Sequence, residues 1–306
     1  MLDSSRLPGG LTMSKQFYKH FEFRAAALHT IDLVNGIVSE YIAQGYRLTV
    51  RQLYYQLVAR GFIENTERSY KRTTGLVNDA RLAGLIDWDA IEDRTRSFAK
   101  RPHWDTGNDI LHAVASQFYM DMWAGQDSRV FVIVEKEALA GVLEGVCHEL
   151  DMPLLPARGY PSGTVLREFA KVDLARCAHE GQGAIILHLG DHDPSGIDMS
   201  RDLEERLQMF NEWDVPLTFH RIALNMAQID EQKPPPNPAK STDSRFEDYV
   251  RNFGEESWEL DALAPQYLGQ LVREWTAKYI DAGLWDERHS EIVDVRARLQ
   301  DTADNF

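Results

Sequence analysis

Three carboxylic acids directly follow two runs of apolar residues, in a pattern that could bind a hard cation. The run Ala184–Leu189 ends in a turn-forming sequence that places Asp191 and Asp193 at alternate positions. A second run, residues 130–134, is followed at once by Glu135. Short, β-branched runs bounded by turn residues are typical of buried parallel strands. The sequence therefore predicts acids at the carboxyl ends of two strands.

Parallel strands end at the same edge of a sheet, where α/β proteins bind their ligands. We therefore expect Glu135, Asp191 and Asp193 to lie in one crevice and to bind Mg²⁺, with Mn²⁺ as an alternative ion, because Mg²⁺ prefers one or two carboxylates and keeps waters for a phosphate substrate. His192 is expected to point away, since alternate residues of an extended backbone diverge. A local alternative is that the aspartates form a turn that caps the following helix.

A tyrosine on a predicted helix is a second candidate for chemistry. Thr49 and Gln52 have the spacing of a capping box at the start of this helix. Apolar residues, Tyr54 among them, form a stripe that would face a core at positions 50, 53, 54, 57 and 58. Tyr55 is rotated by about 100° from that stripe and follows Arg51 by one turn. We expect Tyr54 to pack and Tyr55 to be exposed, either as a nucleophile or as a surface residue near a DNA phosphate.

Basic residues follow this helix and could contact a phosphate backbone. A second helix is predicted over residues 66–84, and the irregular stretch 87–101 comes after it. Two helices followed by such a stretch fit a winged-helix module. A solvated helix face is the alternative for such a charge run. The residues predicted to contact DNA are Arg68, Lys71, Arg72, Arg81, Arg94 and Arg96.

Three segments of the second half resemble a known family. They are VIVEKEAL, RGYPSGTVLREF and LGDHDPSGI, which begin at residues 132, 158 and 189. In order and spacing they are similar to the Toprim domain of the topoisomerase VI A subunit, which the meiotic double-strand-break transesterase shares. In that family the corresponding acids hold Mg²⁺, which implies the same role for Glu135, Asp191 and Asp193. The resemblance is most specific over residues 129–200 and extends over roughly 47–280.

The tyrosine helix adds to this resemblance. Its RxxYY pattern, residues 51–55, resembles the nucleophile helix of the family, which implies that Tyr55 attacks DNA and that Arg51 stabilises the charge. The chain departs from the family at Gln52, where an acid is usual. The segment SWELDAL, residues 257–263, also matches, and Glu259 within it is a candidate for reaching the metal. Without a Walker A sequence, the chain is most similar to the short stand-alone A-subunit homologues.

The resemblance implies an α/β protein with two domains. A winged-helix domain is expected over residues 1–104, and a Toprim domain with a mainly parallel sheet flanked by helices over 105–306. A homodimer acting on double-stranded DNA is implied, in which the tyrosine of one protomer works with the metal of the other, and a separate ATPase subunit is a further expected partner. Two alternatives stay open: a Toprim nuclease that uses activated water, and a DNA-binding protein with a structural or regulatory metal.

Charge is distributed unevenly along the chain. The net charge is −15, yet residues 1–103 carry 15 Lys and Arg against 11 Asp and Glu. An acidic protein is repelled by DNA at long range, so the basic first third is the part expected to bind it. Cys147 and Cys177 are predicted to be buried thiols in a reducing cytoplasm. No apolar run reaches the length of a membrane span, and no signal-peptide pattern is recognised, so a protein of the cytoplasm and nucleoid is expected.

Overall fold

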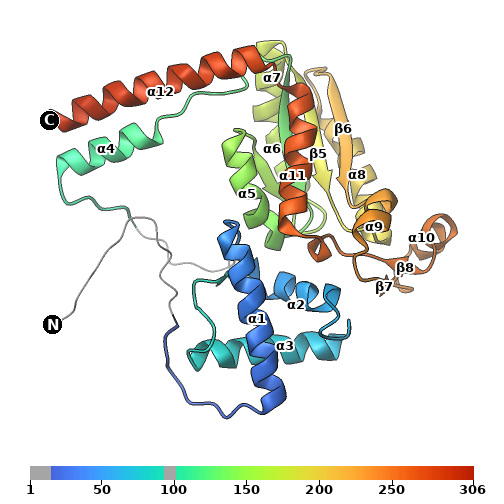
Figure 1. Ribbon diagram of the computed structural model, residues 1–306. Helices are drawn as coiled ribbons and strands as arrows, with labels where there is room; N and C mark the ends of the chain where they lie inside the picture. Colours follow the sequence, from blue (N-terminus) through green and yellow to red (C-terminus); the bar gives the residue numbers. More distant parts are fainter. Residues whose placement is uncertain (1–14, 93–100) are drawn as a thin grey trace, which may run out of the picture. The chain divides into compact units, whose positions relative to one another are not determined.

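The computed structural model describes residues 15–92 and 101–306. The chain forms two compact units, Met1–Thr95 and Arg96–Phe306. This division falls a few residues before the expected boundary at 104. Figure 1 shows the helices of the first unit in blue to teal and the elements of the second unit in green to red.

Helices dominate the first unit. Its elements are α1 (Ala25–Ala43), β1 (Leu48–Thr49), α2 (Val50–Ala59), α3 (Glu67–Leu82) and β2 (Ile91–Glu92). The two short strands pair in parallel. The predicted helix pair is confirmed as α2 and α3. Within residues 15–92 no antiparallel hairpin that would form a wing is found, so the winged-helix assignment stays a prediction.

Local sequence determines where α2 begins. The predicted capping box is confirmed: the Gln52 backbone N–H donates to Thr49 Oγ1 at 3.3 Å, and the Thr49 N–H donates to Gln52 Oε1 at 2.8 Å. Leu53 and Leu57 are fully buried and pack against α1 residues such as Ile37 in the core of this unit. The capping box therefore sets the register that turns the apolar stripe inward.

A four-stranded parallel sheet forms the centre of the second unit. Its strands lie in the order β4-β3-β5-β6, and all three pairings are parallel. The predicted strands after residues 128, 183 and 215 are confirmed, and the α/β class is confirmed with them. The bounds are β3 (Ser128–Val134), β4 (Leu154–Pro156), β5 (Gly183–Leu189) and β6 (Leu217–Ala223).

Helices cover both faces of this sheet. Figure 1 shows α5 and α11 in front of the sheet and α6 and α8 behind it. On the side of α6 and α8, Phe131 and Ile186 are buried against Leu166 and Leu203. A π-helical turn, Ala170–Leu174, joins α6 to α7. The helix bounds are α5 (Ala140–Glu149), α6 (Gly163–Phe169), α7 (Ala175–Glu180), α8 (Pro194–Phe210) and α11 (Pro265–Thr276).

The register of the sheet aligns the two strands that precede the acids. Residues of β3 and β5 pair from Ser128–Gly183 to Val134–Leu189, so both strands end at the same level. The ladder continues beyond them, because the Glu135 N–H donates to the Leu189 carbonyl at 2.9 Å. Glu135 and the Gly190 loop are thereby placed next to each other at the carboxyl edge.

Smaller elements complete the second unit. Beyond β6 the chain forms α9 (Met226–Gln232), β7 (Asn237–Pro238), α10 (Phe246–Phe253) and β8 (Glu256–Ser257). Figure 1 shows α4 (Gly107–Gln117) and α12 (Ala282–Asp304) side by side, away from the sheet. Cys147 and Cys177 are free buried thiols, as predicted. No helix in the described residues is both long and apolar enough to cross a bilayer.

Candidate active site

Glu135 and Asp191 meet at the carboxyl edge of the sheet. Glu135 Oε2 accepts a hydrogen bond from the Asp191 backbone N–H at 2.8 Å. Gly190 leaves room for this contact, because a Cβ there would lie 3.1 Å from the same carboxylate oxygen. The expectation that the two acid-bearing segments lie together is confirmed for this pair.

The Asp191 carboxylate contacts one further segment, at Leu260, and the residue that follows Glu135. Its Oδ1 accepts a hydrogen bond from the Leu260 N–H at 2.8 Å, and its Oδ2 lies 2.9 Å from Lys136 Nζ. Lys136 also forms ion pairs with Glu259 and, at 3.2 Å, with Asp261 Oδ1. Glu259 thus belongs to the same charged cluster. Lys136 and Asp261 were not predicted as site residues, although both lie inside the motifs that carry the resemblance.

Asp193 has a different local role. Its Oδ1 accepts hydrogen bonds from the Gly196 N–H at 2.6 Å and from Ser195 Oγ at 2.9 Å, so it is the N-cap of α8. The capping alternative is therefore correct for Asp193. Across residues 15–92 and 101–306, no three Asp, Glu, His or Cys side chains form a group that could hold a metal ion as they stand.

Burial and like charge dominate the electrostatics of this edge. Burial raises the pKa of Asp191, and the neighbouring carboxylates of Glu135, Asp261 and Glu259 raise it further, while Lys136 acts in the opposite direction and is outweighed. Burial also raises the pKa of Glu135. A divalent cation would relieve this crowding of carboxylates. The donor set is made of hard oxygen ligands, which is the chemistry that Mg²⁺ prefers.

His192 points away from the acids, as predicted. Its ring is buried, with Nδ1 2.8 Å from the Tyr249 hydroxyl, and it packs against Phe253 and Trp258. The backbones of His192 and Trp258 also exchange two hydrogen bonds of 2.9 Å. This pairing attaches the loop that carries Asp191 to the segment that carries Glu259.

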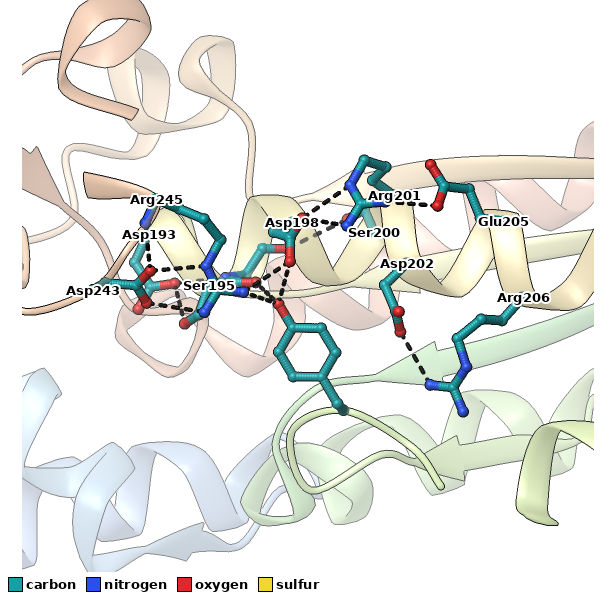
Figure 2. A network of polar contacts seen from close by, with 12 residues as sticks. Asp193, Ser195, Asp198, Ser200, Arg201, Asp202, Glu205, Arg206, Asp243 and Arg245 are labelled. Carbon is teal, nitrogen blue, oxygen red and sulfur yellow. Dashed lines mark hydrogen bonds and ion pairs between the residues drawn. The ribbon is translucent and has the colours of Figure 1, made fainter. Parts of the chain in front are cut away.

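The Gly-Tyr-Pro segment connects to both acid-bearing segments. The Gly159 N–H donates to the Glu135 carbonyl at 3.2 Å, and the Tyr160 hydroxyl donates to Asp198 Oδ2 at 2.6 Å. Arg245 donates to the same Asp198 oxygen at 2.7 Å, and Figure 2 shows this network beside Asp193. Against the opposing effect of burial, hydrogen bonds from Tyr160 and two arginines lower the pKa of Asp198 to about 2. This network places a group of charged side chains next to the acidic loop.

The tyrosine helix differs from prediction at one position. Tyr54 packs as expected, but Tyr55 is also buried, with 5% of its surface exposed. The prediction that Tyr55 is exposed is wrong, because a single apolar stripe does not describe α2: Gln52 and Gln56 on its other sides are buried too. The expected neighbour is present, since the Arg51 guanidinium carbon lies 5.9 Å from the centre of the Tyr55 ring.

The predicted DNA contacts divide into three groups. Arg68, Lys71 and Arg72 are exposed on α3, where Lys71 forms an ion pair with Glu67 at 2.6 Å. Arg81 is used within the fold: its Nη2 donates to the Trp88 carbonyl at 2.8 Å, and its guanidinium lies over the Trp88 ring. Arg81 thus has a role within the fold, and its contact with DNA stays a prediction. Arg94 and Arg96 lie outside the described residues.

Removing the Tyr54 hydroxyl should destabilise the chain. This hydroxyl donates to Asn65 Oδ1 at 3.0 Å and accepts from the Thr66 N–H at 3.0 Å. In Tyr54→Phe these partners lose their bonds inside the fold, so we expect the free energy of unfolding to fall by about 1–3 kcal/mol. Urea denaturation followed by circular dichroism measures this loss. Tyr70→Phe is the matched control, since the Tyr70 ring packs edge-on against Tyr54.

Comparisons with known proteins do not identify a family. A scan against models of protein families gives no match, and a search of curated proteins gives none.

Proposed function

We propose that this chain is a Mg²⁺-dependent DNA-cleaving transesterase of the topoisomerase VI A type. The observation that carries the proposal is the hydrogen bond between Glu135 Oε2 and the Asp191 N–H, two residues 56 positions apart. It joins the VEK strand to the DHDPSG loop, the two motifs on which the resemblance to a Toprim domain most depends. The ion pairs of Lys136 with Asp191 and Glu259 add the SWELDAL segment to the same cluster.

In the proposed reaction the Tyr55 phenol oxygen attacks a DNA phosphorus atom. A bond forms between phosphorus and the phenol oxygen, and the bond to the 3′ oxygen breaks. The phenol proton passes to solvent, the 3′ oxygen takes up a proton from solvent and leaves as a hydroxyl, and the 5′ phosphate stays linked to the tyrosine. A phenol has a pKa of about 10, so the guanidinium of Arg51 would assist its ionisation.

Glu135, Asp191 and Asp193 would hold the metal. When bound, Mg²⁺ supplies Lewis-acid stabilisation of the charge on the phosphate. To bind the metal, these three side chains must be ionised and must point toward one another. Asp193 must do so while its Oδ1 caps α8.

The proposed substrate is double-stranded DNA of the nucleoid. Cleavage of both strands requires two active sites, so a homodimer is part of the proposal, with a tyrosine from one protomer and a metal centre from the other. Strand passage would require an ATPase subunit on a separate chain.

A Toprim nuclease is a second candidate, and the burial of Tyr55 favours it. A phenol with 5% of its surface exposed must become accessible before it can reach a phosphate. Metal-activated water as the nucleophile does not require the Tyr55 oxygen to reach the phosphate.

One experiment separates these candidates. Supercoiled DNA is incubated with the protein and Mg²⁺ or Mn²⁺, denatured with detergent, and analysed for protein bound covalently to 5′ ends. Covalent complexes are the result expected for the transesterase. Broken DNA with free ends indicates the nuclease, and a mobility shift without broken DNA indicates a DNA-binding protein. A chelator control establishes dependence on the metal.

DNA affinity should depend on the exposed cations of α3. In an Arg68→Glu/Arg72→Glu double variant we expect the affinity for duplex DNA to fall by at least about tenfold, because fewer phosphates are neutralised and fewer counterions released. The slope of log affinity against log salt should decrease by about 2. Fluorescence anisotropy at several salt concentrations measures both quantities.

The matched control changes the same net charge in the second unit. Lys240 and Arg298 are exposed there, on a loop and on α12. If Lys240→Glu/Arg298→Glu weakened DNA binding as strongly as the α3 variant, the assignment of DNA binding to the first unit would be incorrect.

A further inference from the structure

Arg221 lies at the end of β6 and contacts the loop that carries the two aspartates. Its Nη2 donates to the carbonyl oxygens of Asp191 and Gly190, at 2.6 and 3.1 Å. Its Nη1 donates to the Gly196 carbonyl at 2.9 Å and to Ser200 Oγ at 2.7 Å. One guanidinium thus contacts both ends of the segment 190–196.

All acceptors of Arg221 in the described residues are neutral. The Leu224 carbonyl, at 3.2 Å from Nη2, completes the set. Burial lowers the pKa of Arg221 to about 10, while the nearby charges of Glu135, Asp191 and Asp193 act in the opposite direction. A buried charge is costly unless its surroundings satisfy it. Here three carbonyl groups of the acidic loop accept hydrogen bonds from the buried guanidinium.

The loop packs closely at its two glycines, one against the guanidinium and one against the loop's own backbone. A Cβ at Gly190 would lie 3.2 Å from Arg221 Nη1, and a Cβ at Gly196 would lie 2.2 Å from the Asp191 carbonyl oxygen. The glycines therefore let the backbone close around the cation. Arg221 donates hydrogen bonds to the loop carbonyls, while the Asp191 N–H donates to Glu135 and the Asp191 carboxylate faces Lys136.

We propose that Arg221 is the positioning residue of the metal centre, which fixes the 190–196 loop so that Asp191 and Asp193 are held beside Glu135. This inference rests on the proposed function. The role of Arg221 depends on the shape of its side chain as well as on its charge. The planar guanidinium donates to five acceptors, and the ammonium group of a lysine cannot reproduce this geometry.

Mn²⁺ binding to the full chain without DNA tests this role. Electron paramagnetic resonance measures the free ion and gives a dissociation constant for the wild type and for Arg221→Lys. Mutation of a residue that orients metal ligands typically lowers metal affinity by roughly 10- to 100-fold. We expect a loss of that size in Arg221→Lys, although the positive charge is kept. Arg206→Lys is the matched control: Arg206 donates to a carbonyl oxygen and to Asp202 on α8, away from the acidic loop.

A second variant decides the matter if Arg221→Lys does not fold. Ser200→Ala removes one acceptor of Arg221, together with the hydroxyl 2.9 Å from His188 Nδ1, and leaves every carboxylate in place; we expect it to weaken Mn²⁺ binding several-fold. Wild-type affinity in a folded Arg221→Lys protein, or in Ser200→Ala when the lysine variant is unfolded, overturns the role of Arg221. A wild-type protein that binds no Mn²⁺ overturns the proposed function itself, which is a different result.

Discussion

Tyr55→Phe is expected to abolish covalent attachment to DNA. The phenylalanine ring keeps the shape of the buried side chain but has no oxygen to bond to phosphorus, so covalent complexes should fall to the background of a chelator control. Stability should change by no more than about 1–3 kcal/mol, the cost of losing a buried hydrogen bond. Detergent-trapped complexes are quantified with 5′-labelled DNA, and stability by urea denaturation.

Tyr54→Phe is the matched variant for this test. Both rings are buried on the same helix, and their centres lie 5.2 Å apart, so a general disturbance of α2 affects both variants. Covalent complexes that persist in Tyr55→Phe and vanish in Tyr54→Phe would mean that the adjacent tyrosine is the nucleophile. Strand breaks without covalent complexes at the wild-type rate in Tyr55→Phe would support hydrolysis by metal-activated water.

Asp191→Asn should separate stability from activity. The amide oxygen can still accept from the Leu260 N–H, but the negative charge is lost. Because burial and neighbouring carboxylates raise the pKa of Asp191, its charge is unfavourable in the fold, and we expect the stability to be unchanged or higher. Metal-dependent cleavage should fall by roughly 100-fold or more, the equivalent of several kcal/mol of lost transition-state stabilisation.

The control for this variant is Asp202→Asn on α8. Asp202 forms an ion pair with Arg206 at 3.0 Å and belongs to the helix that Asp193 caps, outside the acidic cluster. Cleavage by Asp191→Asn at the wild-type rate would remove Asp191 from the metal centre. A large loss of stability would show that the charge supports the fold.

Much of the α/β unit could be predicted from sequence because its strands carry strong local signals. The apolar runs before Glu135 and Asp191 are confirmed as adjacent parallel strands that end at the same level. The capping box at Thr49 is confirmed because its two hydrogen bonds depend only on residues three positions apart. Such features need no knowledge of distant packing.

Other features depend on tertiary contacts, which helical periodicity does not encode. Tyr55 is buried although it lies off the apolar stripe, because α2 is covered on several sides. The contacts of Arg81 with the Trp88 carbonyl and ring likewise depend on how the chain folds back after α3. Arg221 carries no local signal, since its role appears only when β6 lies next to β5.

The attachment of the acidic loop to residues near 260 has a consequence for synthesis of the protein. Asp191 contacts Leu260, and His192 pairs with Trp258. Both partners lie in a segment that is synthesised almost 70 residues later. A growing chain that has produced the tyrosine, both strands and all three acids still lacks these two attachments. Because contacts distant in sequence form only after the connecting chain exists, the acidic edge of the sheet is completed only after residue 260 has been synthesised. If the proposed function is correct, fragments that end before residue 258 are therefore expected not to cleave DNA.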